Sequence, residues 1–265
     1  LVSETTTTDA GVSAYDAAKD SKTRSSFVMF PTNSRRELTP YTRREIVKKH
    51  RALEANCAFL TRLIRKSARH AIGSGIHFRC LSDDEVFNDG MRRLVEEWWN
   101  NPAMYSIDAS VDGWESDRIA AETIMLDGEY NAVLANHPGS GMPCLQPLDV
   151  FEIETPQYGI VGNQPGVFDP NAWDDGVRID AFERPIEFAV RSLPRILGPS
   201  NFDAYRYIPA ESMVHIFRRR RAHGHRGMPW GYSGLNQGID ALDLNALVTG
   251  TAKLHSALAV AVKGT

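Results

Sequence analysis

Apolar residues recur at helical spacing in the first part of the chain. From Thr42 to Gly73 they fall on one face, mostly at steps of three or four, which predicts one amphipathic helix about 45 Å long. Thr42-Arg43-Arg44-Glu45 has the form of a capping box, and Gly73 supplies a stop. The apolar positions of this face are Ile46, Leu53, Cys57, Leu60, Ile64, Ala68 and Ala71.

Two more helices and a short strand are predicted next. We expect a strand at Ile76 to Arg79, a helix at Asp83 to Asn100, and a helix at Trp114 to Leu126 that stops at Asp127-Gly128. The buried side of the first of these helices is expected to carry Val86, Met91, Leu94, Val95 and Trp98. Five acids near these helices could suggest a metal site: Asp83, Asp84, Asp108, Asp112 and Glu115. Positions at helix caps and in first turns explain most of them better.

A strand is expected after the Asp127-Gly128 turn, and from Cys144 to Phe188 the pattern changes to short alternating segments separated by turn residues, which is typical of antiparallel strands. The chain then closes with a helix from Leu235 to Val262, about 40 Å long. Its apolar positions are Leu235, Ile239, Leu242, Ala246, Thr249, Leu254, Leu258 and Ala261. The expected strands are Glu129 to Ala135, Leu145 to Ile153, Val177 to Ile179, Ile186 to Val190 and Ser212 to Phe217, with a turn at Gly162-Asn163-Gln164-Pro165-Gly166.

These elements define an α+β fold class, with long amphipathic helices and a small antiparallel β region. A chain of 265 residues buries enough surface to fold without disulfides. Its three cysteines have no CxxC spacing, so we expect a reducing compartment. Residues 1–40 read as an arm with little periodicity, and the polar opening is not a signal peptide. The missing initial Met and the abrupt helical end lead us to expect a longer protein.

Charge is distributed unevenly, although the formal net charge is only -3. The polar side of the first predicted helix is strongly basic, and its candidate contact residues are Arg62, Arg65, Lys66 and Arg69. A basic face of this kind can meet nucleic acid, meet an acidic face of a partner subunit, or simply be solvated. The sequence leaves these three interpretations open.

A second basic cluster follows the last predicted strand. Guanidinium groups bind phosphate or carboxylate through paired hydrogen bonds, so the cluster is a candidate for contact with DNA or with another subunit. Acids such as Asp174 and Asp175 could face it across a subunit boundary. Because strand side chains alternate, two of the four consecutive arginines are expected to face a partner. The candidates are Arg218, Arg219, Arg220, Arg221 and, slightly later, Arg226.

Catalytic motifs are missing from the sequence. It contains no GxxxxGK[ST] loop, no GxSxG turn and no HExxH motif. His215, His223 and His225 are the best metal candidates, but four adjacent arginines disfavour a cation there. We therefore expect no catalytic residues, no metal and no cofactor, and we do not expect an enzyme.

Several short motifs follow one another in a consistent order from about Tyr41 to Val262, and this series resembles the portal proteins of lambda-like tailed bacteriophages. Two departures occur: Gly224-His225-Arg226-Gly227 lacks a glutamine and one residue, and Glu183 stands where glycine is common. The matching pieces are Arg51-Ala52-Leu53-Glu54-Ala55-Asn56, Ile72-Gly73-Ser74-Gly75-Ile76, Trp98, Asp108, Gly113, Asp127-Gly128-Glu129, Leu145-Gln146, Asp180-Ala181-Phe182-Glu183-Arg184-Pro185, Pro209-Ala210, His215-Ile216-Phe217, Arg221 and Arg226-Gly227-Met228-Pro229-Trp230.

The resemblance implies a structural protein. Residues 41–234 would form the wing-like α+β domain of a portal subunit, and residues 235–265 would begin a stem helix that continues beyond Thr265. Such subunits form a homo-oligomeric ring, dodecameric in the virion, at one capsid vertex. The ring passes double-stranded DNA during packaging and ejection and docks terminase motor, capsid and tail or adaptor proteins. It is assembled in the host cytoplasm.

In that setting the two basic clusters would act mainly between subunits, while Lys253 and Lys263 would face the channel. The alternative is a sequence-independent DNA-binding module that uses Arg218 to Arg221 directly.

Overall fold

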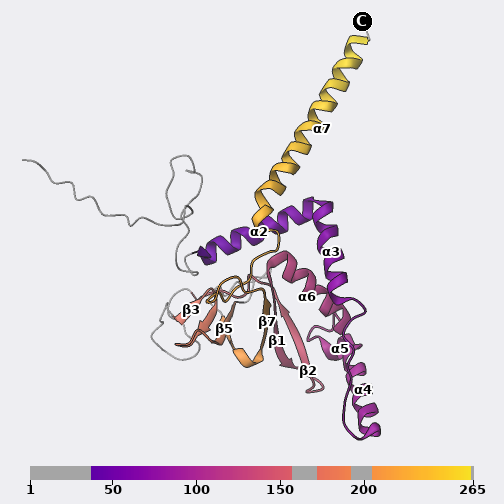
Figure 1. Cartoon of the computed structure of the whole chain (residues 1–265), viewed down its shortest axis with the longest axis vertical. Coiled ribbons are helices and arrows are strands. Elements are labelled where there is room, and N and C mark those ends of the chain that lie inside the picture. Colours follow the sequence, from indigo (N-terminus) through magenta and orange to yellow (C-terminus); the bar gives the residue numbers. More distant parts are fainter. Residues whose placement is uncertain (1–36, 157–171, 192–204, 264–265) are drawn as a thin grey trace, which may run out of the picture.

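The computed structural model describes residues 37–156, 172–191 and 205–263, with side chains as far as residue 257 (Figure 1). Helices and two small sheets make up this part of the chain, which confirms the α+β class. Residues 1–36 of the predicted arm and the predicted turn at 162–166 lie outside the described residues.

The first predicted helix is two helices, α2 (Pro40–Asn56) and α3 (Ala58–Ile72), so the prediction of one continuous helix is wrong. Cys57 between them is extended, with φ -123° and ψ 95°. The Asn56 side chain donates to the Ala52 carbonyl at 2.7 Å, and the Thr61 hydroxyl donates to the Glu54 carbonyl at 2.8 Å. These local side-chain bonds satisfy carbonyls near the end of α2 and so stabilise a corner.

Three helices follow: α4 (Glu85–Trp99) and α5 (Pro102–Tyr105) lie at one edge of the molecule, and α6 (Gly113–Asp127) packs between β1 and α3 (Figure 1). The cap predictions are confirmed, because Asp84 accepts hydrogen bonds from the first-turn amides of α4 and Asp112 does so for α6. Two expectations are wrong. The segment from Ile76 to Arg79 has no strand conformation. On the expected buried side of α4, Val86 and Leu94 are exposed, whereas Met91, Val95 and Trp98 are half-buried; Trp99 is the residue of this helix that is buried.

Both sheets are antiparallel, as predicted, and they share one hydrophobic core. The predicted strand from Leu145 to Ile153 is too long, because Asp149 begins a turn that ends at Glu152. The first sheet has the order β2 (Pro143–Leu148), β1 (Glu129–Asn136), β7 (Met213–Phe217), and the second has the order β3 (Trp173–Asp174), β4 (Val177–Ile179), β5 (Pro185–Arg191), β6 (Tyr205–Pro209). The shared core contains Val133, Leu148, Ile153, Val177, Ile179, Phe188, Val190 and Met213.

The last helix, α7 (Leu235–Lys263), follows the short η5 turn (Tyr232–Gly234) and projects away from the rest of the structure (Figure 1). Its first turn is anchored, because Leu235 is buried and Gly238 lies against the Leu53 side chain of α2. Beyond Leu242 the described side chains of α7 are exposed. The predicted helix is confirmed, and its apolar positions are buried or half-buried only as far as Leu242 in the described part. In the described part of the chain, no helix is both long and apolar enough to cross a membrane.

Glu183 adopts a left-handed conformation, with φ 63°, in the turn between β4 and β5. Non-glycine residues pay a steric cost in this region, whereas glycine does not. The structure therefore explains why glycine suits this position and why Glu183 is a departure. The Glu183 carbonyl accepts a hydrogen bond from His225 Nε2 at 3.0 Å.

Candidate assembly and nucleic-acid interface

A buried carboxylate, Glu129, lies at the centre of the molecule. It begins β1, directly after the Asp127-Gly128 turn, and its side chain is fully buried. Arg226 Nε donates to both Glu129 oxygens at 3.0 Å, and the Gly227 amide donates to Oε2 at 2.9 Å. Arg43 Nη1 lies 3.6 Å from Oε1, and His215 Nε2 lies 3.4 Å from Oε2. We call Arg43, Glu129, Asp175, His215 and Arg226 the Glu129 network.

Arg226 was predicted to contact a neighbouring subunit or DNA, and its position corrects that prediction. The residue is 6 % exposed, and its guanidinium donates to Glu129 and to the backbone carbonyls of Val150, Ile153 and Asp175. A guanidinium whose donors are satisfied internally holds its own chain together. Here it ties the loop after β7 to β1 and to the turn before β4.

The suggested role of Asp174 and Asp175 as acids across a subunit boundary is also corrected. Asp175 is buried and pairs with Arg43, on the first turn of α2. Asp174 accepts a hydrogen bond from His225 Nδ1 at 2.7 Å. Both acids are therefore used inside the subunit, where they join the small sheet to α2 and to the loop that leads to α7.

Two glycines allow this loop to approach β1 closely. A Cβ built on Gly227 would lie 2.0 Å from the Gly128 carbonyl oxygen, and one on Gly128 would lie 2.2 Å from the Met228 backbone. Gly128 also has φ 93°. The Asp-Gly-Glu and Arg-Gly motifs of the sequence thus meet in space, which places Glu129 within reach of Arg226.

Burial and pairing shift the pKa values of this cluster in different directions. Burial alone would raise the pKa of Glu129, but Arg226 and Arg43 hold that pKa well below its usual value. Burial lowers the pKa of His215. The hydrogen bond to Asp174 raises the pKa of His225, whose two nitrogens face a carboxylate and a carbonyl, both of which only accept.

The arginine run (Arg218, Arg219, Arg220 and Arg221) lies in an irregular, exposed loop, because β7 ends at Phe217. The expected alternation along a strand is therefore wrong. Arg221 Nε lies 3.0 Å from Glu37 Oε2, and Arg220 stacks on the Tyr232 ring at 4.5 Å. The run stands between the segment before α2 and the entry of α7, so it marks the base of the projecting helix.

The three histidines considered as metal ligands have different surroundings. His215 contacts Glu129, whereas His225 contacts Asp174 and Glu183, and His223 is exposed. Within the described ranges, no group of three or more His, Cys, Asp or Glu side chains is placed to hold a metal ion.

The basic side of the first predicted helix divides at Cys57 into two groups with different surroundings. On α2, Arg44 pairs with Glu154 at 2.9 Å, and Arg51 pairs with Asp127 at 2.7 Å. On α3, the four predicted contact residues are exposed, and no ion pair joins them to a described acid. We call Arg62, Arg65, Lys66 and Arg69 the α3 basic face.

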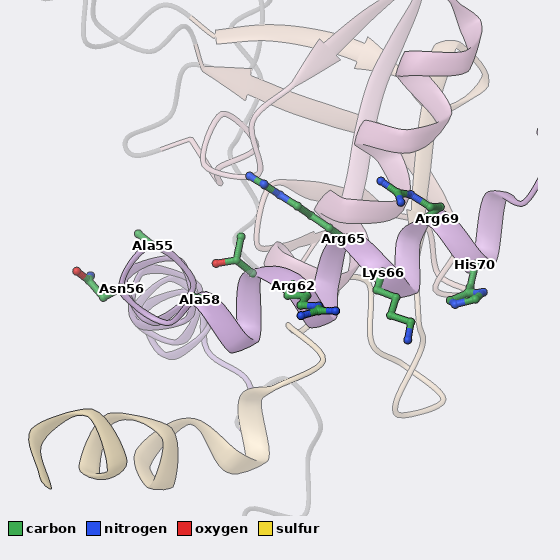
Figure 2. A pocket seen from close by; sticks show the side chains of 9 residues that line it. Ala55, Asn56, Ala58, Arg62, Arg65, Lys66, Arg69 and His70 are labelled. Carbon is green, nitrogen blue, oxygen red and sulfur yellow. The ribbon is translucent and has the colours of Figure 1, made fainter. Parts of the chain in front are cut away.

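A hollow of about 860 Å³ lies in the corner between the end of α2 and α3 (Figure 2). Arg65 and Arg69 extend toward one edge of α3, while Lys66 and His70 point toward the other. A second hollow of about 540 Å³ shares Arg65 and Arg69 and continues toward α6. Sequence reasoning found these cations, but the corner that makes their surface concave was not predicted.

A row of exposed residues runs along α7. Leu244 is 61 % exposed, Leu247 is 69 % exposed and Leu254 is 67 % exposed, and Thr251 lies between them. Their steps of three, four and three residues repeat every seven residues, as in helices that pack side by side. We call these four residues the α7 seam. The predicted channel residue Lys253 is exposed and lies roughly 140° around the helix from the seam, at 100° per residue. Lys263 is in the last turn of α7, and its side chain lies outside the described part.

Comparison with known proteins identifies one family. A model of the family described as phage portal protein, lambda family, matches residues 21–265. No curated protein matches the chain.

Proposed function

This chain belongs to the lambda family of phage portal proteins, and on that premise we propose that it is the portal subunit that forms a ring at one capsid vertex. Membership implies a virion component that forms a homo-oligomeric ring and contacts capsid, terminase and tail proteins. The finer proposal is a dodecameric ring, assembled in the host cytoplasm, whose central channel passes double-stranded DNA inward during packaging and outward during ejection. The role requires no catalytic centre.

The α7 seam is the observation that carries this proposal. A helix with three large exposed leucines on one side, standing away from its own domain, leaves apolar surface in water. Copies of α7 arranged around an axis would cover that surface. We therefore assign residues 41–234 to the wing-like domain and residues 235–265 to the start of the stem.

The charges of α7 fit a channel that lets DNA slide. A protein that neutralises many phosphates holds the duplex, because each contact releases counterions and adds affinity. Lys253 and Lys263, the last residue of α7, would give the channel few cations. A channel of this kind contacts DNA weakly and transiently.

The arginine run is proposed to act between subunits at the base of α7. Its four guanidinium groups are exposed, and Glu37 and Tyr232 occupy only part of their surface. A closed ring joins one flank of each subunit to the opposite flank of the next, so complementary patches are needed on both. We expect Arg219 and Arg220 to matter more for ring formation than for DNA affinity.

Light scattering and electron microscopy of the purified full-length protein test the proposal. A large closed ring with a central hole is expected. A monomer at high concentration with strongly salt-dependent DNA affinity would overturn it and favour the alternative DNA-binding module.

The double variant Arg219→Ala/Arg220→Ala tests the role of the arginine run. Ring formation should fall while DNA affinity changes little, and Arg92→Ala/Arg93→Ala on α4 is the matched control. Intact rings that no longer bind DNA would show that the run serves DNA instead.

A further inference from the structure

The exposed side of α3 carries two adjacent stripes of different chemistry. The first is the α3 basic face. The second contains Phe59, which is 76 % exposed, and Leu63, which is 49 % exposed and one turn away on the same side. On the opposite side of the helix, Ile64 and Ala68 are buried against α6. The outward surface of α3 therefore carries a cationic stripe next to a shorter apolar one, and the exposed His70 follows Leu63 along the second stripe.

The cations of this surface have no described acid to pair with, although arginines elsewhere in the chain do. Arg43, Arg44, Arg51 and Arg226 all reach carboxylates of their own subunit. The α3 basic face instead lines the hollow at the α2–α3 corner, where Figure 2 shows its side chains spread along the helix beside the end of α2. Arg65 and Arg69 also line the second hollow, in which Glu122 of α6 pairs with Arg118 at 3.0 Å. A concave surface that carries unpaired positive charge is suited to an anionic partner.

The apolar stripe distinguishes between possible anionic partners. A DNA backbone offers phosphates and sugars, and burial of Phe59 and Leu63 against it would gain little. A protein segment can supply both chemistries, with carboxylates opposite the cations and apolar side chains opposite Phe59 and Leu63. The surface therefore matches an acidic amphipathic helix better than it matches a duplex.

The described acids of this chain do not supply that helix to a ring neighbour. The exposed acids at the two ends of α4 lie along the same edge of the subunit as α3 (Figure 1); they are Asp83, Asp84 and Glu85 at its start and Glu96 and Glu97 near its end. A cyclic ring joins opposite flanks of its subunits, so we do not expect two patches on the same flank to pair between neighbouring copies.

We propose that the outward face of α3 is a docking site for an acidic amphipathic helix of a partner protein, held by the α3 basic face and by Phe59 and Leu63 together. Along α3, which is about 22 Å long for 15 residues, such a helix would make about four turns of contact. The hollow at the α2–α3 corner would receive one end of it. This proposal does not depend on ring formation, because it uses one subunit only.

Fluorescence anisotropy with a labelled synthetic peptide tests the site on the full-length protein. The probe is an 18-residue helical peptide that carries Glu and Leu on adjacent stripes; a scrambled peptide of the same composition is its control. We expect the ordered peptide to bind at least tenfold more tightly than the scrambled one. Arg62→Glu/Lys66→Glu and, separately, Phe59→Ser/Leu63→Ser should each weaken binding at least tenfold.

Matched variants keep the test specific. Lys49→Glu/Arg93→Glu reverses two exposed charges elsewhere and should change peptide affinity less than twofold. Arg65→Glu/Arg69→Glu serves as a second charge variant if the first pair lowers the melting temperature. Equal binding of both peptides, or of all variants, would overturn the proposal.

Two further results would overturn it in favour of another partner. In the first, a 20-bp DNA duplex binds more tightly than the peptide, and the charge variant loses this binding while the apolar variant keeps it. That result would identify a DNA surface. Loss of the ring in light scattering with the charge variant would identify a subunit interface.

Discussion

Two groups of arginines in this protein have the same side chain and opposite surroundings. In the Glu129 network, Arg43 and Arg226 are buried with their carboxylates. On the α3 basic face, Arg62, Arg65 and Arg69 are exposed and meet no described acid. The first group stabilises the subunit, whereas the second is available to a partner. Basic residues in a sequence therefore indicate a binding surface only after the internal acids have been assigned.

The two groups differ in how much folding free energy is lost when one of their charges is removed. Removal of one partner from a buried ion pair leaves the other charge without solvent or counter-charge, which costs about 3–5 kcal/mol. Removal of an exposed charge costs less than about 1 kcal/mol, because water replaces the interaction. The following experiments compare the two groups, from the largest expected effect to the smallest.

Substitution of the central carboxylate should give the largest loss of stability. Glu129→Gln keeps the shape of the side chain but leaves Asp175 as the one carboxylate of the network beside the two buried cations, Arg43 and Arg226. We expect the free energy of unfolding in urea to fall by about 3–5 kcal/mol. Glu97→Gln, at an exposed position of α4, is the control and should change it by less than about 0.5 kcal/mol. Equal effects of both variants would show that Glu129 is not held as described.

Acid should weaken the same network. The folded-state pKa of Glu129 lies well below the 4.5 of an unperturbed glutamate, so the unfolded chain takes up this proton first as the pH falls. Stability from Glu129 is therefore fully present above about pH 4.5 and is lost as the pH falls through the folded pKa. The lowered pKa of His215 acts in the same direction below 6.5.

Urea denaturation at a series of pH values measures this effect. The wild type should lose stability between about pH 5 and pH 3, and Glu129→Gln should show a shallower slope over that interval. Parallel slopes for the two proteins would assign the acid sensitivity to other groups.

Two glycine substitutions compare how tightly the chain is packed around the Glu129 network and along the projecting helix α7. In Gly227→Ala the new Cβ would meet the Gly128 carbonyl at 2.0 Å, so we expect a loss of about 1–3 kcal/mol from overpacking. Gly250→Ala in α7 has no atom within 4 Å of its new Cβ and should stabilise the helix by up to about 1 kcal/mol. Thermal melts followed by circular dichroism measure both, and a destabilising Gly250→Ala would show that α7 is packed where the structure leaves it open.

The smallest effect on stability is expected from the α3 basic face. Arg62→Glu/Lys66→Glu should change the free energy of unfolding by less than about 0.5 kcal/mol, because both side chains are exposed. Urea denaturation measures this value on the same preparation used for peptide binding. A loss above about 2 kcal/mol would place these cations with the buried group.

The sequence alone determined most of the local structure. Helical periodicity located α4, α6 and α7, and Asp84 and Asp112 were identified as caps because these acids precede apolar runs and bond to free amides. Short alternating segments located β4 and β5 for an equally local reason, since neighbouring side chains on a strand point to opposite faces. The turn signal at Asp127-Gly128 located β1, and a run of apolar, β-branched and aromatic residues located β7. The ordered motifs around Gly128, Arg226 and Trp230 also led to the correct family.

Tertiary structure decided which charges are used where. Arg226 and Arg62 look alike in the sequence, and only the approach of Gly227 to Gly128 brings Arg226 to Glu129, 97 residues away. The corner at Cys57 and the exposure of Val86 and Leu94 on α4 likewise depend on which elements pack together. Periodicity shows which face of a helix is apolar, but contacts between residues distant in the chain determine whether that face is covered.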